Sequence, residues 1–396
     1  MKKRTIKDVD LAGRRVLMRV DFNVPIEDGK ITDDTRIRSS IPSIDYALGH
    51  RAKVVVLCSH LGRPKGKPKP EFSLKPVADR LSSLLKRTVV FAEDCIGEPV
   101  KKAVERAGDG GVVLLENLRF HAEEEKNDPA FAKQLAESAD VYINDAFGSA
   151  HRAHASTVGV VQYVKEAAAG LLMAAELEYL GRVLERPDHP FVAILGGAKV
   201  SDKLEVIENL VPRVDALLIG GAMAYTFFKA RNVPVGKSLV EEDLVGAARD
   251  VEQKAKARGL RLELPVDHVV APKLESGAPA ETLDVGDPAI GDRMGLDIGP
   301  KTIETYRSVI ASAKTVVWNG PMGVFEIDAF AKGTIEVAKA MAAVKGTTII
   351  GGGDSISAVA KAGVTGRITH ISTGGGASLE FLGGRELPGV AALPDA

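Results

Sequence analysis

The chain has 396 residues, of which 45% are hydrophobic and 27% charged, and this composition is typical of a globular protein with two or three domains. Its 52 Lys and Arg residues balance 53 Asp and Glu residues to a net charge of −1, which excludes a basic surface over the whole molecule for nucleic acid. The cysteines, Cys58 and Cys95, form no C-x-x-C pair and no disulfide framework, so we expect a reducing, cytoplasmic compartment.

The N-terminal segment is basic at Lys2, Lys3 and Arg4, but charges recur from Lys7 onward where a signal peptide would have an apolar region. The longest apolar stretch, residues 167–175, is far shorter than the ~20 residues of a membrane span. We therefore expect neither secretion nor membrane insertion.

Short β-branched runs, each followed by a polar corner and a helical period, recur through the first half of the chain. Such runs are apolar throughout, which is typical of parallel strands covered on both faces. Residues 1–165 are therefore predicted to form an N-terminal α/β domain with strands at Arg15–Val20, Lys53–Cys58, Gly111–Leu115 and Asp140–Ile143. Cys58 lies within one of these runs, so it is interpreted as a buried structural thiol.

A segment rich in Ala, Leu and Glu, Lys165–Leu184, separates the two halves and has no proline. It predicts a long helix, and we interpret residues 166–186 as a connector between two doubly wound parallel-sheet domains with a cleft between them. A second domain is predicted over residues 187–373, with strands at Phe191–Leu195, Ala216–Ile219, Thr315–Trp318, Thr347–Ile350 and Ile368–Ile371.

The corners after the first-half strands carry cations and polar groups. In open α/β sheets ligands bind at the carboxyl ends of the strands, so these side chains are expected to converge. Convergent like charges predict a polyanionic ligand, and the arginine fork suits phosphate and carboxylate. The corner residues of interest are Asp21, Asn23, Arg36, His60, Arg63, Arg119 and Arg152, although any one arginine could equally be a solvated surface charge.

The second-half corners are rich in glycine instead: Gly196-Gly197, Gly220-Gly221, Gly320, Gly351-Gly352-Gly353 and Gly374-Gly375-Gly376. Glycine lets the backbone approach a ligand closely, and a helix N-terminus directs free N–H groups at phosphate. These corners favour a nucleotide site, while tight strand-to-helix turns are the alternative explanation. Lys199 and Lys203 are predicted near a helix start, where they could share one face and bind a phosphate chain.

Five segments resemble the signatures of phosphoglycerate kinases: Arg19–Pro25, Ser59–Pro64, Gly196–Lys203, Trp318–Glu326 and Gly351–Ser355. The resemblance extends from Asp21 to Gly376. It implies that Asp21, Asn23, Arg36, His60, Arg63, Arg119 and Arg152 hold 3-phosphoglycerate. It implies nucleotide binding by Lys199, Lys203, Gly295, Asn319, Glu326 and Gly352–Ser355.

The resemblance also implies Mg²⁺ bound as Mg-ADP or Mg-ATP at Asp354, and a catalytic set of Arg36, Lys199, Gly375 and Gly376. Residues 374–396 are expected to return to the first domain. The implied protein is a cytoplasmic, glycolytic monomer. It would transfer a phosphoryl group in line from 1,3-bisphosphoglycerate to ADP, giving 3-phosphoglycerate and ATP, as the domains close about a hinge.

Two other readings of the sequence predict different behaviour. A kinase for another acyl phosphate would need fewer cations than four arginines. A protein that only binds polyanions such as nucleic acid would show affinity that depends steeply on salt, independence from Mg²⁺, and interleaved aromatic residues, but aromatics are 5% of this chain.

Overall fold

The β-branched runs form the strands of two separate parallel sheets. The structure, a computed structural model, describes residues 2–396, and they fall into two compact units. Unit 1 extends to Glu178 and includes Glu386–Ala396, and unit 2 is Tyr179–Arg385. The α/β class and the two parallel sheets predicted from the sequence are confirmed.

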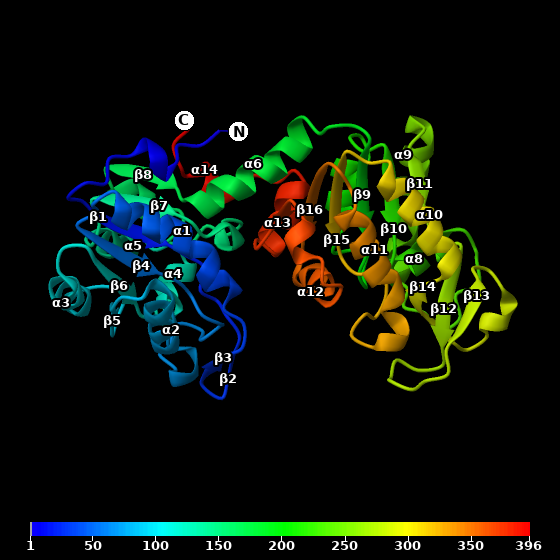
Figure 1. Cartoon of the computed structure of the whole chain (residues 1–396), viewed down its shortest axis with the longest axis horizontal. Coiled ribbons are helices and arrows are strands. Elements are labelled where there is room, and N and C mark those ends of the chain that lie inside the picture. The colour runs from blue at the N-terminus through cyan, green and yellow to red at the C-terminus, as the bar shows by residue number, and fades with distance from the viewer. Residues whose placement is uncertain (1) are drawn as a thin grey trace. The chain divides into compact units, whose positions relative to one another are not determined.

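Unit 1 is a six-stranded sheet in the order β5-β6-β4-β1-β7-β8, and every neighbouring pair is parallel. Helices pack against it in the blue and cyan part of Figure 1. Its strands are β1 (Arg15–Arg19), β4 (Val54–Cys58), β5 (Val89–Ala92), β6 (Gly111–Leu115), β7 (Val141–Asn144) and β8 (Glu166–Ala169). The remaining elements are the hairpin β2 (Ile26–Glu27) and β3 (Lys30–Ile31), and the helices α1 (Thr35–Gly49), α2 (Lys75–Leu85), α3 (Glu98–Ala107), α4 (Ala122–Glu125), α5 (Pro129–Ala136) and α14 (Pro388–Ala391).

The apolar pattern of the strands accounts for the core of unit 1. All five residues of β4 are buried, as a strand covered on both faces requires. Val16, Val55, Val112 and Ile143, from four adjacent strands, have no exposed surface. The expected burial of Cys58 is confirmed.

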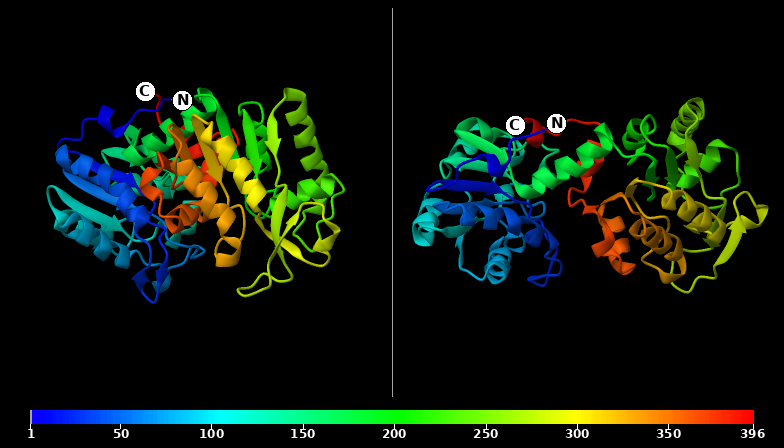
Figure 2. Two further views of the ribbon diagram at one scale, coloured as in Figure 1. Left: turned by 45° about the vertical axis from the view of Figure 1, so that its right-hand side comes forward. Right: turned by 45° about the horizontal axis from the view of Figure 1, so that its top comes forward.

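Unit 2 repeats the architecture with the order β11-β10-β9-β15-β16-β17, which Figure 2 shows in green to red from two further directions. Its sheet strands are β9 (Phe191–Leu195), β10 (Ala216–Ile219), β11 (Arg261–Glu263), β15 (Thr315–Asn319), β16 (Thr347–Gly351) and β17 (His370–Ile371). Its helices are α7 (Leu204–Leu210), α8 (Met223–Ala230), α9 (Val245–Arg258), α10 (Pro300–Ala311), α11 (Lys332–Ala342), α12 (Gly353–Lys361) and α13 (Gly376–Leu382).

Unit 2 also contains an antiparallel sheet that is not among the elements predicted from the sequence. Strands β12 (Asp267–Ala271), β13 (Glu281–Asp284) and β14 (Met294–Ile298) pair in the order β13-β12-β14. Strand β13 is mostly exposed, so its sequence lacks the continuous apolar run that identifies the central strands.

Two predicted boundaries differ from the structure. The helix between the halves, α6, spans Leu171–Glu185, while Glu166–Ala169 pairs with β7 as strand β8. The segment that joins unit 1 begins at Glu386, whereas α13 packs on α7 within unit 2. Ala-rich sequence suits a helix, but Ala167–Ala169 are buried small residues that also fit a sheet edge.

The first described residue, Lys2, and the last, Ala396, lie side by side in unit 1. The N–H of Ala396 donates to the carbonyl of Lys2 at 3.1 Å, and both views of Figure 2 show the ends side by side. Among residues 2–396, every helix falls short of the length and apolar character needed to cross a bilayer.

Candidate functional site

The carboxyl ends of the unit 1 strands carry a set of basic side chains, here called the cation group. Its members are Arg19, Arg36, His60, Arg63, Arg119 and Arg152. Arg19 ends β1, His60 follows β4, and Arg119 lies in the 3-10 helix Leu118–Phe120 after β6. Because parallel strands end at one edge of their sheet, the topology places these corners together.

Burial and the charges of nearby arginines lower the pKa of two histidines at this edge, His60 and His154. Burial lowers the pKa of His60 well below its ordinary value, and the charges of Arg19, Arg119 and Arg36 lower it further. Burial also brings the pKa of His154 down to about 4, with Arg19, Arg119 and Arg152 contributing. His60 and His154 are therefore neutral at pH 7, and the arginines repel each other in the absence of an anion.

The side chain of Arg119 is held in place by the loop around it. Its Nη1 donates to the carbonyl of Gly62 at 2.9 Å, and its Nε lies 3.7 Å from a carboxylate oxygen of Glu125, an ion pair too long for a hydrogen bond. Its Nε is buried and, among residues 2–396, has no hydrogen-bond partner. Burial is the main cause that lowers the pKa of Arg119. Nε therefore has an acidic neighbour but no hydrogen bond, and an arginine that is not fully hydrogen-bonded favours an anionic ligand.

Asp21 and Asn23 order the corner after β1. Asn23 accepts a hydrogen bond from the N–H of Gly62 at 2.8 Å, and its own N–H donates to Asp21 at 3.1 Å. Arg36 is the second residue of α1, donates to the carbonyl of Asn23 at 2.7 Å and lies 3.6 Å from Asp21. Arg63 and Arg152 are exposed, and Arg152 donates to His151 at 3.2 Å.

Buried residues that are not among the site residues predicted from the sequence support the cation group. Arg19 has no exposed surface and donates to Ser156 at 2.8 Å, and its Nη2 lies 3.2 Å from Nδ1 of His60. Ser156 in turn donates to Glu124, a fully buried carboxylate whose pKa is raised chiefly by burial. Arg19 sits inside an apolar run, a signal that was available, whereas nothing distinguishes Glu124 from its neighbours Glu123 and Glu125.

Asn117 fixes the two loops that carry His60 and Arg119. Its side-chain oxygen accepts from the N–H of Leu61 at 3.2 Å and of Arg119 at 3.0 Å. Its amide nitrogen donates to the carbonyls of Leu61 and Phe72 at 2.7 and 2.9 Å. All hydrogen-bonding capacity of this buried amide is therefore used for the shape of the site.

Two cavities lie at the corresponding edge of unit 2. The glycine-lined cavity, of about 380 Å³, is bounded by Lys199, Lys203, Asn319 and the glycine corners, including Gly352, Gly353, Gly375 and Gly376. The apolar cavity, of about 330 Å³, is bounded by Tyr225, Met294, Gly295, Leu296 and Glu326 among others. Asp354 lines both cavities.

The two predicted lysines reach the same cavity without sharing a helical face. Helix α7 begins at Leu204, Lys203 precedes it as its N-cap, and Lys199 lies in the preceding loop. Lys203 is 9% exposed and its ammonium donates to the side-chain oxygen of Asn319. Burial lowers the pKa of Lys203, and the charges of Asp202 and Asp354 oppose that shift. The amide nitrogen of Asn319 is buried and, within residues 2–396, has no hydrogen-bond partner.

The glycine corners serve two different purposes. A Cβ on Gly196 would lie 2.2 Å from the carbonyl oxygen of Pro321, and one on Gly320 would lie 2.1 Å from that of Gly196. These glycines let neighbouring loops pack. In contrast, a Cβ on Gly197, Gly353 or Gly375 would meet nothing within 4 Å. Close packing of the turns thus explains Gly196 and Gly320. At Gly197, Gly353 and Gly375 the backbone is open to the cavity.

Gly295 and Ser355 are placed by specific neighbours. A Cβ on Gly295 would lie 1.5 Å from the hydroxyl of Tyr225, and its N–H donates to Ser238 at 2.9 Å. The buried hydroxyl of Ser355 accepts from the N–H of Gly320 at 2.7 Å, whereas Asp354 and Glu326 are exposed. The structure therefore brings the predicted nucleotide residues to two adjoining cavities of unit 2.

Comparison with known proteins agrees with this arrangement. The family profile "Phosphoglycerate kinase" matches residues 6–385. The chain is 58% identical to the phosphoglycerate kinase of Koribacter versatilis, over 99% of both chains, and 59% identical to that of Anaeromyxobacter sp., over 100% of both.

Solved structures give the same result. Phosphoglycerate kinase from Coxiella burnetii matches with a TM-score of 0.89 and 42% identity, over 98% of each chain. The enzyme from Pyrococcus horikoshii matches with a TM-score of 0.84 and 36% identity, again over 98% of each chain. The chain belongs to the phosphoglycerate kinase family.

Proposed function

We propose that unit 1 binds 3-phosphoglycerate and unit 2 binds the nucleotide in the family's reaction. That reaction is the reversible glycolytic transfer of a phosphoryl group from 1,3-bisphosphoglycerate to ADP, giving 3-phosphoglycerate and ATP. The observation that carries the division is the contrast between the two sheet edges. One presents clustered arginines with a buried donor that makes no hydrogen bond, and the other presents open glycine backbone beside a buried lysine.

On unit 1, the acid would be held by Arg63, Arg119 and Arg152 through its phosphate, with His60, Asn23 and Asp21 shaping the corner and contacting its polar groups. Arginine binds phosphate through two parallel hydrogen bonds. Nδ1 of the neutral His60 ring faces the Arg19 guanidinium and must accept from it, so the ring proton lies on Nε2, which can donate to a carboxylate or hydroxyl oxygen of the substrate. Arg36 would neutralise the reacting carboxylate.

On unit 2, the base and ribose would occupy the apolar cavity between Gly295 and Glu326. The phosphates would extend into the glycine-lined cavity, where Lys203, Asn319 and the turn Gly352–Ser355 offer donors. Helix α12 starts at Gly353, so its free N–H groups favour an anion at that end. Asp354, which lines both cavities, stands where such a chain would pass.

The residues of unit 2 fit a magnesium ion that arrives with the nucleotide. Asp354 and Asp202 both line the glycine-lined cavity, and Mg²⁺ is commonly held by one or two carboxylates together with substrate phosphates and water. We propose Asp354 as its ligand. When bound, the ion neutralises phosphate charge.

The chemistry that the chain itself supplies is positioning and charge neutralisation. The nucleophile in the ATP-consuming direction is a carboxylate, which is ionised at pH 7, so no general base is needed. Two unit charges at about 4 Å repel by roughly 4 kcal/mol at an effective dielectric near 20. Arg36, Lys199 and the backbone at Gly375 and Gly376 would offset that repulsion around the phosphoryl group in flight.

Because the two ligands bind to different units, in-line transfer requires that they approach each other and exclude water. We propose that this closure is driven by both ligands together. Solution scattering profiles that do not change on addition of both ligands would contradict it. We also propose that the protein is a cytoplasmic monomer that binds neither nucleic acid nor membranes.

A coupled assay of ATP consumption with 3-phosphoglycerate, with and without Mg²⁺, tests the proposal. Activity is expected only when ATP, 3-phosphoglycerate and Mg²⁺ are all present. Lys199→Ala separates chemistry from binding, since Lys199 is exposed in a loop. Turnover is expected to fall at least about a hundredfold, while the affinity for Mg-ADP measured by calorimetry changes little. Unchanged turnover would remove Lys199 from the chemistry.

A further inference from the structure

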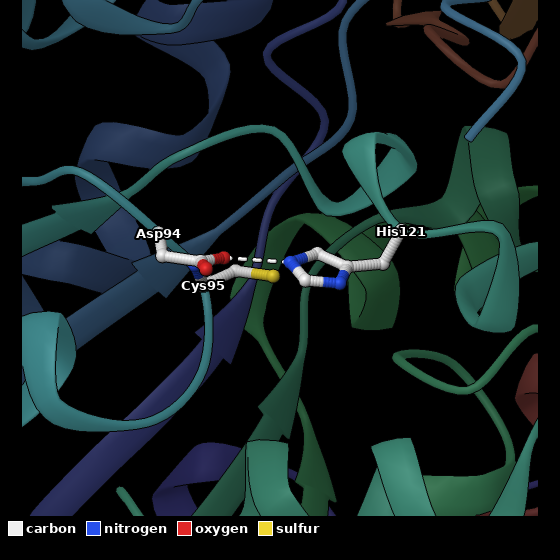
Figure 3. A group of neighbouring side chains, drawn as sticks. All are labelled: Asp94, Cys95 and His121. Atoms are coloured by element: carbon white, nitrogen blue, oxygen red, sulfur yellow. Dashed lines mark hydrogen bonds and ion pairs between the residues drawn. The ribbon is translucent and has the colours of Figure 1, made fainter. Parts of the chain in front are cut away.

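Three metal-ligating side chains gather in unit 1 outside the residues discussed so far. Asp94 and Cys95 follow β5, and His121 precedes α4 after β6. Strands β5 and β6 are parallel neighbours, so the loops at their carboxyl ends adjoin. Figure 3 shows the three side chains directed at one another from these loops.

The geometry of this group is compact. Nε2 of His121 lies 2.7 Å from Oδ1 of Asp94, and one ligand atom from each residue lies within 4.8 Å of both others. The ring of His121 is steadied by Phe131, with ring centroids 5.3 Å apart. The sulfur belongs to a residue that is 1% exposed, while the side chains of His121 and Asp94 are 27% and 39% exposed. Solvent thus reaches the group from one side.

We propose that Asp94, Cys95 and His121 form a binding site for a zinc-type transition-metal ion. Thiolate, imidazole and carboxylate are the three donors that Zn²⁺ takes in proteins, and a thiolate disfavours Mg²⁺ and Ca²⁺. Three protein ligands leave a fourth position for water. The site differs in both donor chemistry and location from the magnesium ligand proposed in unit 2.

The charge balance supports a divalent ion. An ionised Asp94, an ionised Cys95 and a neutral His121 neutralise a 2+ charge, so the occupied site would place no net charge in a half-buried corner. Binding releases the thiol proton of Cys95 to solvent, while the neutral imidazole of His121 keeps its single proton on the ring nitrogen that does not bind the metal.

The required adjustment is small. In a tetrahedral site with bonds of about 2.0–2.3 Å the ligand atoms lie roughly 3.3–3.8 Å apart. The Asp94–His121 hydrogen bond would therefore open slightly while the sulfur moves inward. Residues 93–97 form bends outside the sheet, so no strand pairing is lost in this movement.

The chain offers a sharp test because Cys58 and Cys95 are its only cysteines. Co²⁺ bound to a thiolate gives a sulfur-to-metal charge-transfer absorption, and that absorption can come from one of two residues. Titration of the full-length protein with Co²⁺ is expected to produce the band at one equivalent, and Zn²⁺ is expected to abolish it by competition.

The matched variants are Cys95→Ala and Cys58→Ala, since both thiols are buried. The band should vanish in Cys95→Ala and persist in Cys58→Ala. Asp94→Asn can keep the contact with His121 but loses the anionic donor, so Co²⁺ affinity should fall at least about tenfold while circular dichroism shows an intact fold. Absence of the band in the wild type, its survival in Cys95→Ala, or unchanged affinity in Asp94→Asn would overturn the proposal.

Discussion

Single buried polar atoms define the candidate site more sharply than the overall charge of the chain does. Nε of Arg119 and the amide nitrogen of Asn319 are both buried and make no hydrogen bond within the described part of the chain, although Nε lies 3.7 Å from Glu125. Leaving such donors unpaired costs about 1–3 kcal/mol each. A bound anion or nucleotide would recover that free energy by forming the missing hydrogen bonds. These atoms therefore favour the ligand-bound protein over the unliganded folded protein.

Arg119→Lys tests this argument for the acid site. Lysine keeps the charge but loses the planar fork and the Nε donor, so affinity for 3-phosphoglycerate should fall about tenfold to a hundredfold. Calorimetry measures the change. The matched control is Arg106→Lys, an exposed arginine that donates to the carbonyl of Phe91. Equal affinities in the two variants would show that Arg119 contributes charge only.

At the scale of elements, the strand-to-helix corners of unit 2 contain glycines that pack and glycines that line the cavity. Gly320 has a φ of +95° and no room for a Cβ, whereas Gly353 has open space around it at the start of α12. Sequence alone cannot separate the two kinds, because both appear as glycine after a strand.

Gly320→Ala should therefore lower stability, whereas Gly353→Ala should weaken nucleotide binding. Gly320→Ala combines backbone strain with a backbone clash, so it should lower the free energy of unfolding by about 3 kcal/mol. Gly353→Ala should leave stability nearly unchanged but weaken Mg-ADP binding, since its methyl group would enter the cavity. Denaturant unfolding and calorimetry on both variants measure the two effects. Loss of stability in Gly353→Ala would contradict this division.

Helix α6 begins at a buried carboxylate. Asp145 accepts hydrogen bonds from the N–H groups of Leu172 and Met173 at 2.9 and 3.2 Å. Burial nevertheless raises its pKa from 3.8 to about 7. Between these two values the folded state holds a proton that the unfolded state has lost, so the contribution of Asp145 to stability falls as pH rises and levels off above about 7.

Asp145→Asn keeps an oxygen for these N–H groups and cannot ionise. The free energy of unfolding of the variant, relative to the wild type, should therefore increase from about pH 5 to about pH 8. Chemical denaturation at both pH values measures the difference, in which the other titrating groups cancel. A difference that does not depend on pH would show that Asp145 has the same pKa in the folded and unfolded states.

At the scale of the whole molecule, the last residues of the chain complete unit 1. Leu387, Val390 and Leu393 are each 2% exposed. Lys3 donates to the carbonyl of Leu393 and pairs with Asp395, both at 2.8 Å. The segment therefore stabilises a unit that is otherwise built from the first half of the sequence.

Deletion of residues 386–396 should destabilise unit 1 selectively. Burial of three aliphatic side chains contributes about 5 kcal/mol or more, so hydrogen exchange should become faster in β7 and β8. Strands β9 and β15 of unit 2 serve as the control in the same experiment and should keep their protection. Equal acceleration in both units would contradict the assignment of this segment to unit 1.

The central strands could be predicted from the sequence because they are continuous apolar runs. Val54–Cys58 and Phe191–Leu195 are buried along their whole length, and burial on both faces leaves a local signal. Strands β8 and β13 have no such apolar run, because β8 is largely alanine and β13 is mostly exposed.

The sequence by itself determined two parallel-sheet halves, the arginines and histidines after the strands of one, and the glycine corners of the other, since strand pattern and corner chemistry are local properties. Tertiary structure alone decided the rest. The pairing of buried Arg19 with Ser156, the reach of Lys203 to Asn319, and the separation of packing glycines from open ones depend on segments far apart in the chain. Such contacts form only when the sheet brings its strand ends together, and no local pattern encodes their distances.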